Sequence, residues 1–278
     1  PLVLEKVYRK QIAPMLEKGP LSIAMKVPLL NEVVRMKIKE KMLQSFGGNL
    51  EMFIVGGAPM NRETEAFLKS IHFPIIVGYG MTETAPLISF TPWDRFRSQS
   101  CGQVLKGFME ARIANPDADG VGEIQVRGEN VMVGYYKNEQ ATKDSFTADG
   151  WLRTGDLGVI DEDGYIYIKG RCKTMLLGPS GQNIYPEEIE AKINNMPYVL
   201  ESLVLQKDTR LVALVCPDFE AVDADKLTQE QLEVVMEENR KLVNAELAAY
   251  EQINELRIYT HEFEKTPKKS IKRFLYEA

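Results

Sequence analysis

Cysteine is scarce in this chain: three occur in 278 residues, at Cys101, Cys172 and Cys216, and no two form a CxxC pair. This spacing argues against a disulfide framework and against a cysteine zinc site. Long apolar runs are also lacking, since no stretch approaches the roughly 20 residues that a transmembrane helix needs. The start, PLVLEKVYRK, does not have the order of a signal peptide. We therefore expect a reduced, cytoplasmic protein.

A strong charge imbalance is missing as well. The net charge is −6, with 27% charged and 44% hydrophobic residues. Such a mildly acidic composition gives no reason to expect nucleic acid as a partner, and the single short basic run, KTPKKSIKR, is too little to change that. The length and apolar content are sufficient for a sizeable core and for more than one domain.

The N-terminal part has helical and strand patterns in alternation. Helical spacing runs to about Phe46, where Gly47 and Gly48 predict its end. NLEMFIVGG and FPIIVGYG then predict strands, and the segment between them, NRETEAFLKSI, predicts a helix that Asn61 caps. Strand, helix and strand in this order indicate a parallel βαβ unit, whose ligands gather at the carboxyl ends of the strands.

The pattern changes twice further along. Residues 101–170 hold short alternating runs separated by Asp-Gly turns, which predict a small β subdomain. Residues 171–278 alternate strand and helix patterns again, including a long helix from about Thr228 to Tyr250, and predict a small α+β domain.

The end of the second predicted strand, VGYGMTET, has residues suited to a nucleotide. Gly78 and Gly80 let a planar or anionic ligand approach the backbone, and the Tyr79 ring can stack on a base. Thr82 offers a hydroxyl to a phosphate, and Glu83 offers a hard carboxylate oxygen suited to Mg²⁺. The alternative is a tight turn with exposed polar side chains.

Six motifs in order carry a resemblance to a known family. They are GGAP, YGMTET, GEIQVRGENVMVGYY, DGWLRTGD, GRCKTMLLGPSGQNIYPEEIE and TPKKSIKR. Their order and spacing resemble the adenylate-forming superfamily, and the opening and ending are most similar to long-chain fatty acid CoA ligases. The fold that the resemblance implies is α/β plus β and α+β. Residues 1–170 would be the C-terminal portion of the large AMP-binding domain, and residues 171–278 a mobile small domain.

The resemblance implies a site for ATP or AMP. Thr82 would contact the α-phosphate, Glu83 would hold Mg²⁺, and the ionised Asp156 would accept hydrogen bonds from both ribose hydroxyls. Arg171 would donate near the ribose. The full set that the resemblance assigns to the nucleotide is Gly56, Gly57, Ala58, Tyr79, Gly80, Thr82, Asp156 and Arg171. For Asp156 and Arg171 taken alone, the alternatives are a turn aspartate and a surface ion pair.

The small domain would take part in both half-reactions. Lys173 stands at the family's hinge position, about which this domain rotates between adenylate formation and thioester formation. Gly181 is the best match for the loop that approaches the pantetheine arm of coenzyme A, and its alternative is a simple turn. A lysine near the C-terminus would complete adenylation. Here TPKKSIKR departs from the family's glycine-lysine ending, so Lys269, Lys272 or Ser270 could occupy that position, and we favour Lys272 as the catalytic group.

The family's upstream phosphate-binding loop is missing, as is the initiator methionine. We expect the chain to be the C-terminal portion of an enzyme about twice as long, and to be inactive alone. The expected substrates are a long-chain fatty acid, ATP and coenzyme A. The alternatives are adenylation of an aromatic or amino acid, and a non-catalytic nucleotide-binding module. Peripheral membrane contact for the lipid substrate and self-association through exposed sheet edges are further expectations.

Overall fold

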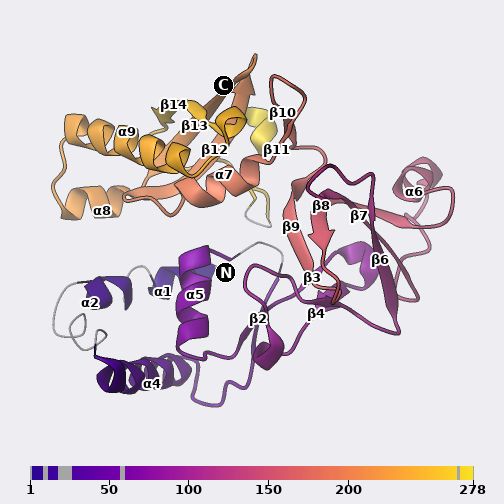
Figure 1. Cartoon of the computed structure of the whole chain (residues 1–278), viewed down its shortest axis with the longest axis horizontal. Coiled ribbons are helices and arrows are strands. Elements are labelled where there is room, and N and C mark those ends of the chain that lie inside the picture. The colour runs from indigo at the N-terminus through magenta and orange to yellow at the C-terminus, as the bar shows by residue number, and fades with distance from the viewer. Residues whose placement is uncertain (1, 9–11, 18–26, 57–59, 268–269, 278) are drawn as a thin grey trace. The chain divides into compact units, whose positions relative to one another are not determined.

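The computed structural model describes residues 2–8, 12–17, 27–56, 60–267 and 270–277. Its contacts divide the chain into two compact units. Unit 1 comprises Pro1–Thr154 with Gly158–Ile168, and unit 2 comprises Gly155–Leu157 with Lys169–Ala278 (Figure 1). The assignment of residues 1–170 and 171–278 to a large AMP-binding portion and a mobile small domain stays a prediction.

Unit 1 begins with helices, of which the longest is α4. The helices are α1 (Leu2–Val7), α2 (Ala13–Glu17) and α4 (Pro28–Ser45). After α4, the Gly47 N–H donates to Gln44 O and the Gly48 N–H to Leu43 O, each at 2.9 Å. Both glycines have left-handed backbone, with φ of +88° and +79°. This pair of bonds is a Schellman ending, so the helix stop expected at these glycines is confirmed.

The predicted βαβ unit is present. The strands β1 (Phe53–Val55) and β2 (Ile75–Val77) pair in parallel, and α5 (Arg62–Ser70) connects them. The Asn61 side chain accepts from the Thr64 N–H at 3.1 Å and caps α5 as expected. Apolar residues of the helix and of both strands form one buried cluster, which includes Val55, Phe67, Leu68, Ile76 and Val77.

The second strand ends earlier than the sequence predicts. Tyr79–Gly80 forms a separate strand, β3, which pairs with β4 (Leu87–Phe90), and β4 pairs with β5 (Gln103–Val104). A Cβ added at Gly80 would lie 1.8 Å from Pro86 O, so only glycine permits this approach of the two backbones. The strand pattern of FPIIVGYG therefore covers two strands in different sheets.

The expected β subdomain is a sheet of four strands. The strands are β6 (Met109–Ala114), β7 (Gly122–Gly128), β8 (Leu152–Ile160) and β9 (Ile166–Arg171), in that order across the sheet. The short helix α6 (Glu139–Ser145) lies between β7 and β8 in sequence. The glycines of the Asp-Gly turns, Gly120, Gly150 and Gly164, all have positive φ, which confirms the turns.

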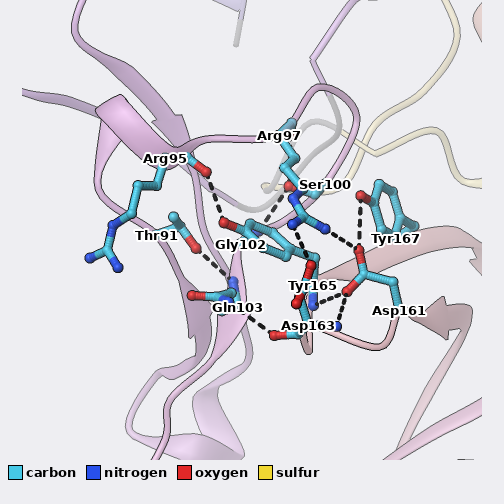
Figure 2. A network of polar contacts seen from close by, with 10 residues as sticks. All are labelled: Thr91, Arg95, Arg97, Ser100, Gly102, Gln103, Asp161, Asp163, Tyr165 and Tyr167. Carbon is cyan, nitrogen blue, oxygen red and sulfur yellow. Dashed lines mark hydrogen bonds and ion pairs between the residues drawn. The ribbon is translucent and has the colours of Figure 1, made fainter.

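A polar network fastens the segment after β4 to the turn between β8 and β9. Arg97 pairs with Asp161 at 2.8 Å and with Asp163 at 2.5 Å, and its guanidinium lies 4.1 Å from the Tyr165 ring centroid (Figure 2). The Tyr165 hydroxyl donates to Arg95 O at 2.8 Å. The network joins the β3–β4–β5 sheet to the four-stranded sheet, and so fixes the segment that follows the predicted nucleotide-binding turn.

Unit 2 is the expected α+β structure. Three strands, β12 (Val199–Lys207), β13 (Arg210–Pro217) and β14 (Ile253–Ile258), form its sheet in that order. Its remaining elements are β10 (Leu176–Leu177), β11 (Asn183–Ile184), α7 (Pro186–Ile193), α8 (Phe219–Ala224), α9 (Gln229–Ala245), η4 (Ala249–Glu251) and η5 (Arg273–Leu275). Figure 1 shows α7 and α9 across one face of the sheet.

The central strand β13 is apolar along its length because both of its faces are covered. Leu211, Ala213 and Val215 belong to the cluster that includes residues of α7 and α9. Val212 and Leu214 belong to a second cluster, which contains Phe263 from the C-terminal segment. A strand covered on both sides needs a continuous apolar run rather than alternation. In the described part of the chain, no helix is long and apolar enough to cross a membrane.

Candidate nucleotide-binding site

The predicted nucleotide-binding turn is a single 3₁₀ turn, η2 (Thr82–Thr84), in unit 1. Thr84 is buried, and its hydroxyl donates to Pro86 O at 2.8 Å. The Asn130 amide donates to Thr84 O at 2.6 Å and to Leu87 O at 2.9 Å. Because one side chain satisfies two carbonyls at the end of the turn, the turn is fixed from outside as well as by its own bonds.

Glu83 is held by the segment that follows β7. The Tyr135 hydroxyl donates to Glu83 Oε1 at 2.7 Å, and the Met132 N–H donates to Glu83 O at 2.8 Å. The hydrogen bond to Glu83 is the main cause of a raised pKa for Tyr135, since loss of the phenol proton would place two negative charges side by side. Thr82, next to Glu83, is exposed. The turn therefore presents one hydroxyl and one oriented carboxylate.

The Tyr79 side chain is buried and does not face solvent as a ring that stacks on a base from outside would. It is 7% exposed and packs with Ile88, Met109 and Ile124 in the core of the β part of unit 1. Gly80 beside it is exposed. The predicted contacts of the Tyr79 ring and of Gly80 with a nucleotide stay predictions.

The ends of the two parallel strands are close to each other. A Cβ added at Gly56 would lie 3.6 Å from Gly78 O. The structure thus places the first glycine of GGAP beside the end of β2, as the sequence predicts. The other two predicted residues of this motif, Gly57 and Ala58, lie outside the described residues.

Two predicted ribose-binding residues pair within unit 2. Arg171 Nε lies 3.0 Å from Asp156 Oδ1, with side-chain exposures of 60% and 15% respectively. Gly155 has a left-handed backbone, with φ of +71°, and its carbonyl accepts from the Cys172 N–H at 2.9 Å. The segments TGD and GR are therefore neighbours in the structure, although Asp156 and Arg171 are 15 residues apart in the sequence. The ion pair holds the carboxylate while leaving the guanidinium largely exposed.

The predicted hinge and coenzyme A residues lie on turns of unit 2. Lys173 is exposed and follows the end of β9. Gly181 has φ of +82°, and its N–H donates to Gly178 O at 2.9 Å in the turn between β10 and β11. A turn with this φ favours glycine. The geometry therefore fits a loop near the pantetheine arm and also fits a simple turn.

Lys272 and Ser270 lie in a C-terminal hairpin whose described residues are 264–267 and 270–272. Lys272 Nζ pairs with Glu264 Oε2 at 3.0 Å, and the Lys272 N–H donates to Glu264 O at 2.9 Å. Ser270 is exposed near the tip, where its carbonyl accepts from the Thr266 N–H at 2.8 Å. Lys269 lies outside the described residues. To reach a substrate, Lys272 would have to leave Glu264.

Sequence reasoning assigned no role to Asn130 or Tyr135. Both lie in GENVMVGYY, a motif that was used for the family resemblance only. The amide of Asn130 and the phenol of Tyr135 could have drawn attention, because both are hydrogen-bonding groups in a motif that otherwise forms a strand and a turn.

The profile of the AMP-binding enzyme family matches residues 6–136. This part of the chain is similar to AMP-binding enzymes. A long-chain-fatty-acid–CoA ligase of Gallus gallus is 34% identical over 183 residues, which are 66% of this chain and 24% of that protein. A long-chain-fatty-acid–CoA ligase of Mycobacterium bovis is 33% identical over 190 residues, which are 68% of this chain and 30% of that protein. The chain thus spans less than a third of these curated relatives.

Several solved structures have a similar fold. ATP-bound MatB of Rhodopseudomonas palustris is 29% identical with a TM-score of 0.66, covering 82% of this chain and 45% of that one. O-succinylbenzoate coenzyme A synthetase of Bacillus subtilis, in complex with AMP, is 25% identical with a TM-score of 0.66, covering 86% and 50%. The adenylation domain of a Mycobacterium chelonae carboxylate reductase, 22% identical, has a TM-score of 0.76 over 99% of this chain and 43% of that one. The expected resemblance to this family and the expected fold class are confirmed.

Proposed function

We propose that this chain is part of an enzyme that activates a long-chain fatty acid with ATP and transfers the acyl group to coenzyme A. The main support is the similarity, over about two thirds of the chain, to long-chain-fatty-acid–CoA ligases. The fatty acid carboxylate would attack the α-phosphorus of ATP and release pyrophosphate, and the thiol of coenzyme A would then displace AMP. Adenylation supplies the good leaving group that a carboxylate lacks.

Each site residue has a role that its chemistry supports. Thr82 would donate its exposed hydroxyl to the α-phosphate, while Asp156 would accept from the ribose hydroxyls. Arg171 would hold Asp156 in orientation and add positive charge near the nucleotide. A positive group from the C-terminal hairpin, Lys269 or Lys272, would stabilise the charge that accumulates during adenylation.

Glu83 fits a magnesium ion that is shared with nucleotide phosphates. Among the residues that the structure describes, no group of three or more His, Cys, Asp or Glu could enclose a metal ion. Mg²⁺ in nucleotide enzymes takes one or two carboxylates together with phosphates and water, so one oriented carboxylate suffices. When bound, the ion would neutralise charge on the phosphates. Tyr135 would keep the carboxylate of Glu83 in the orientation that such a contact needs.

The acceptor step would use unit 2. We propose that Lys173 is the pivot about which this unit turns between the two half-reactions, and that Gly181 then lines the path of the pantetheine arm. A glycine there would let the arm pass close to the backbone. A cytoplasmic location and peripheral membrane contact for the fatty acid belong to the same proposal.

The decisive experiment is an assay of the full-length protein that contains this chain, with acids of graded length. We expect AMP release that requires coenzyme A and is greatest for long acyl chains. A maximum for aromatic or amino acids would contradict the proposed substrate, and absence of pyrophosphate exchange with every acid would contradict the proposed reaction. The 278-residue chain alone is expected to form no acyl-adenylate, although it could still bind AMP weakly, because the parts that hold pyrophosphate in the family are not in it.

Two observations favour a second function, a nucleotide-binding module without catalysis. The C-terminal motif departs from the family pattern, and Lys272 is engaged with Glu264. In that case the full-length protein would bind AMP but exchange no pyrophosphate. Ser270→Lys would separate this function from the proposed enzyme. A gain of pyrophosphate exchange would identify Ser270 as the position of the missing lysine.

A further inference from the structure

The C-terminal segment of unit 2 covers the sheet face opposite α7 and α9. Phe263 is buried against Leu203, Val212 and Leu214. The Tyr276 ring contacts Phe263 edge to face, with centroids 5.1 Å apart, and its hydroxyl accepts from the Glu264 N–H at 2.6 Å. The hairpin that carries Lys272, with described residues 264–267 and 270–272, is thus attached at one side by aromatic packing.

A partly buried ion pair attaches the other side. Arg273, immediately after the hairpin, donates to both carboxylate oxygens of Glu190 on α7, at 2.6 and 2.5 Å. Arg273 also donates to Val204 O at 3.1 Å, and Glu190 Oε1 accepts from the Val204 N–H at 2.6 Å. The pair therefore binds both the N–H and the carbonyl of Val204. Because β12 is an edge strand, these two groups would otherwise be available to a neighbouring strand.

The same arginine connects to the segment after β9. Its Nη2 lies 3.7 Å from Glu187 Oε1, and that oxygen accepts from the Thr174 hydroxyl at 2.6 Å. Glu187 Oε2 is buried without a hydrogen-bond partner and lies 2.9 Å from the position of a Cβ at Gly170. Thr174 adjoins the proposed pivot Lys173. A continuous polar chain therefore leads from the hairpin through α7 to the proposed hinge.

We propose that Arg273 is a positioning residue that locks the lysine-bearing hairpin to α7 and to the hinge segment, so that these parts of unit 2 move together. The functional part of this inference rests on the proposed function. Arg273 touches no reacting atom; it acts through the hairpin. A planar guanidinium is needed because two carboxylate oxygens and one carbonyl are bound at once, which an ammonium group cannot reproduce.

The first test measures hydrogen exchange in the 278-residue chain and needs no activity. Arg273→Lys is expected to speed amide exchange of residues 264–272 and of residues 171–175 by about tenfold or more, with the far-UV spectrum unchanged. Arg257→Lys is the matched control, since Arg257 pairs with Glu255 on the exposed part of the same unit. Unchanged exchange at both segments would overturn the proposal, and a change at the hairpin alone would overturn its link to the hinge.

A second variant addresses the pair itself. Glu190→Gln keeps the shape of the side chain and removes its charge. If the two residues act as one unit, Arg273→Lys with Glu190→Gln should change exchange no more than the larger single effect. Additive effects would contradict the clamp.

The third test uses the full-length enzyme and separates the two half-reactions. Arg273→Lys should lower kcat for pyrophosphate exchange by up to about 100-fold with KM for ATP little changed, because the hairpin is misplaced rather than the nucleotide. Thioester formation from supplied acyl-adenylate should be nearly unaffected. Equal losses in both half-reactions would indicate a merely structural role. If the wild-type enzyme exchanged no pyrophosphate, the proposed function would fail, while the exchange measurements would still decide the clamp.

Discussion

At the scale of the residue, the hydroxyl of Tyr135 and the carboxylate of Glu83 form a pair that is central to the proposed chemistry. The contact is 2.7 Å and lies on the exposed side of the turn. It explains how a partly exposed carboxylate keeps one orientation.

This pair predicts a titration effect. Glu83→Gln should lower the pKa of Tyr135 towards the ordinary phenol value, because the hydrogen bond to Glu83 is the first cause of its rise. Ultraviolet difference titration against Tyr135→Phe would isolate this phenol. Glu129→Gln, on the same segment, is the control and should leave the difference spectrum unchanged; equal curves for Glu83→Gln and wild type would contradict the contact.

Sequence reasoning reached some of these residues and missed others for a physical reason. Gly47 and Asn61 act on their immediate neighbours, through backbone conformation and a local cap, so their surroundings predict their geometry. Asn130 and Tyr135 bond to partners 46 and 52 residues away, and local pattern has no information on such distances. The roles of the nucleotide residues came from family resemblance and stay predictions.

At the scale of the element, strand β3 shows that the apolar pattern of the sequence does not by itself predict where a strand ends. The apolar run through Val77 predicts one strand, while the close approach of Gly80 to Pro86 starts another sheet. The Asp-Gly turns and the Schellman ending were predictable because each depends on two or three adjacent residues.

The approach of β3 to β4 makes Gly80→Ala severe. A Cβ 1.8 Å from Pro86 O must displace a backbone, so we expect a loss of about 3 kcal/mol or more in the free energy of unfolding. Gly56→Ala is the matched control, because its Cβ would meet Gly78 O at an ordinary 3.6 Å. Denaturant unfolding followed by circular dichroism would compare them. Similar midpoints for the two variants would show that β3 does not lie against β4 in this way.

The contact between α7 and the C-terminal segment predicts a pH dependence. Burial raises the pKa of Glu190 from its ordinary 4.5 to about 7, against the opposing effect of Arg273. The folded state therefore holds this proton more tightly than the unfolded state, and the contribution of Glu190 to stability falls as pH rises from about 4.5 to about 7. Relative to Glu190→Gln, the wild type should lose up to about 3 kcal/mol across this window.

Thermal unfolding at pH 5 and pH 7.5 would measure the effect. Glu188→Gln, on the same helix and paired with Lys169, provides the comparison. A wild-type stability that increased relative to Glu190→Gln over this range would show that the pairing with Arg273 outweighs burial.

At the scale of the whole molecule, unit 1 exposes several large apolar side chains. Its parallel sheet has two strands, β1 and β2, and Ile54 on β1 is 57% exposed. Leu30 and Met36 on α4 are 51% and 62% exposed. These features agree with a chain that spans only part of its relatives.

We therefore expect the isolated chain to self-associate through β1. Sedimentation velocity should show concentration-dependent oligomers, and Ile54→Lys should shift them towards monomer, since a charge blocks pairing at a strand edge. Val234→Lys, a substitution at an exposed apolar residue of α9 in unit 2, is the control. A chain that stayed monomeric at high concentration would contradict this expectation.

The dependence of the small sheet on the last residues of the sequence has a consequence for protein quality control. A truncated gene product ending at Tyr259 would leave Leu203, Val212 and Leu214 without Phe263 above them. That bare strip is what chaperones and degradative proteases recognise. A stop codon after Tyr259 would thus lower the amount of the polypeptide in the cell as well as remove its chemistry.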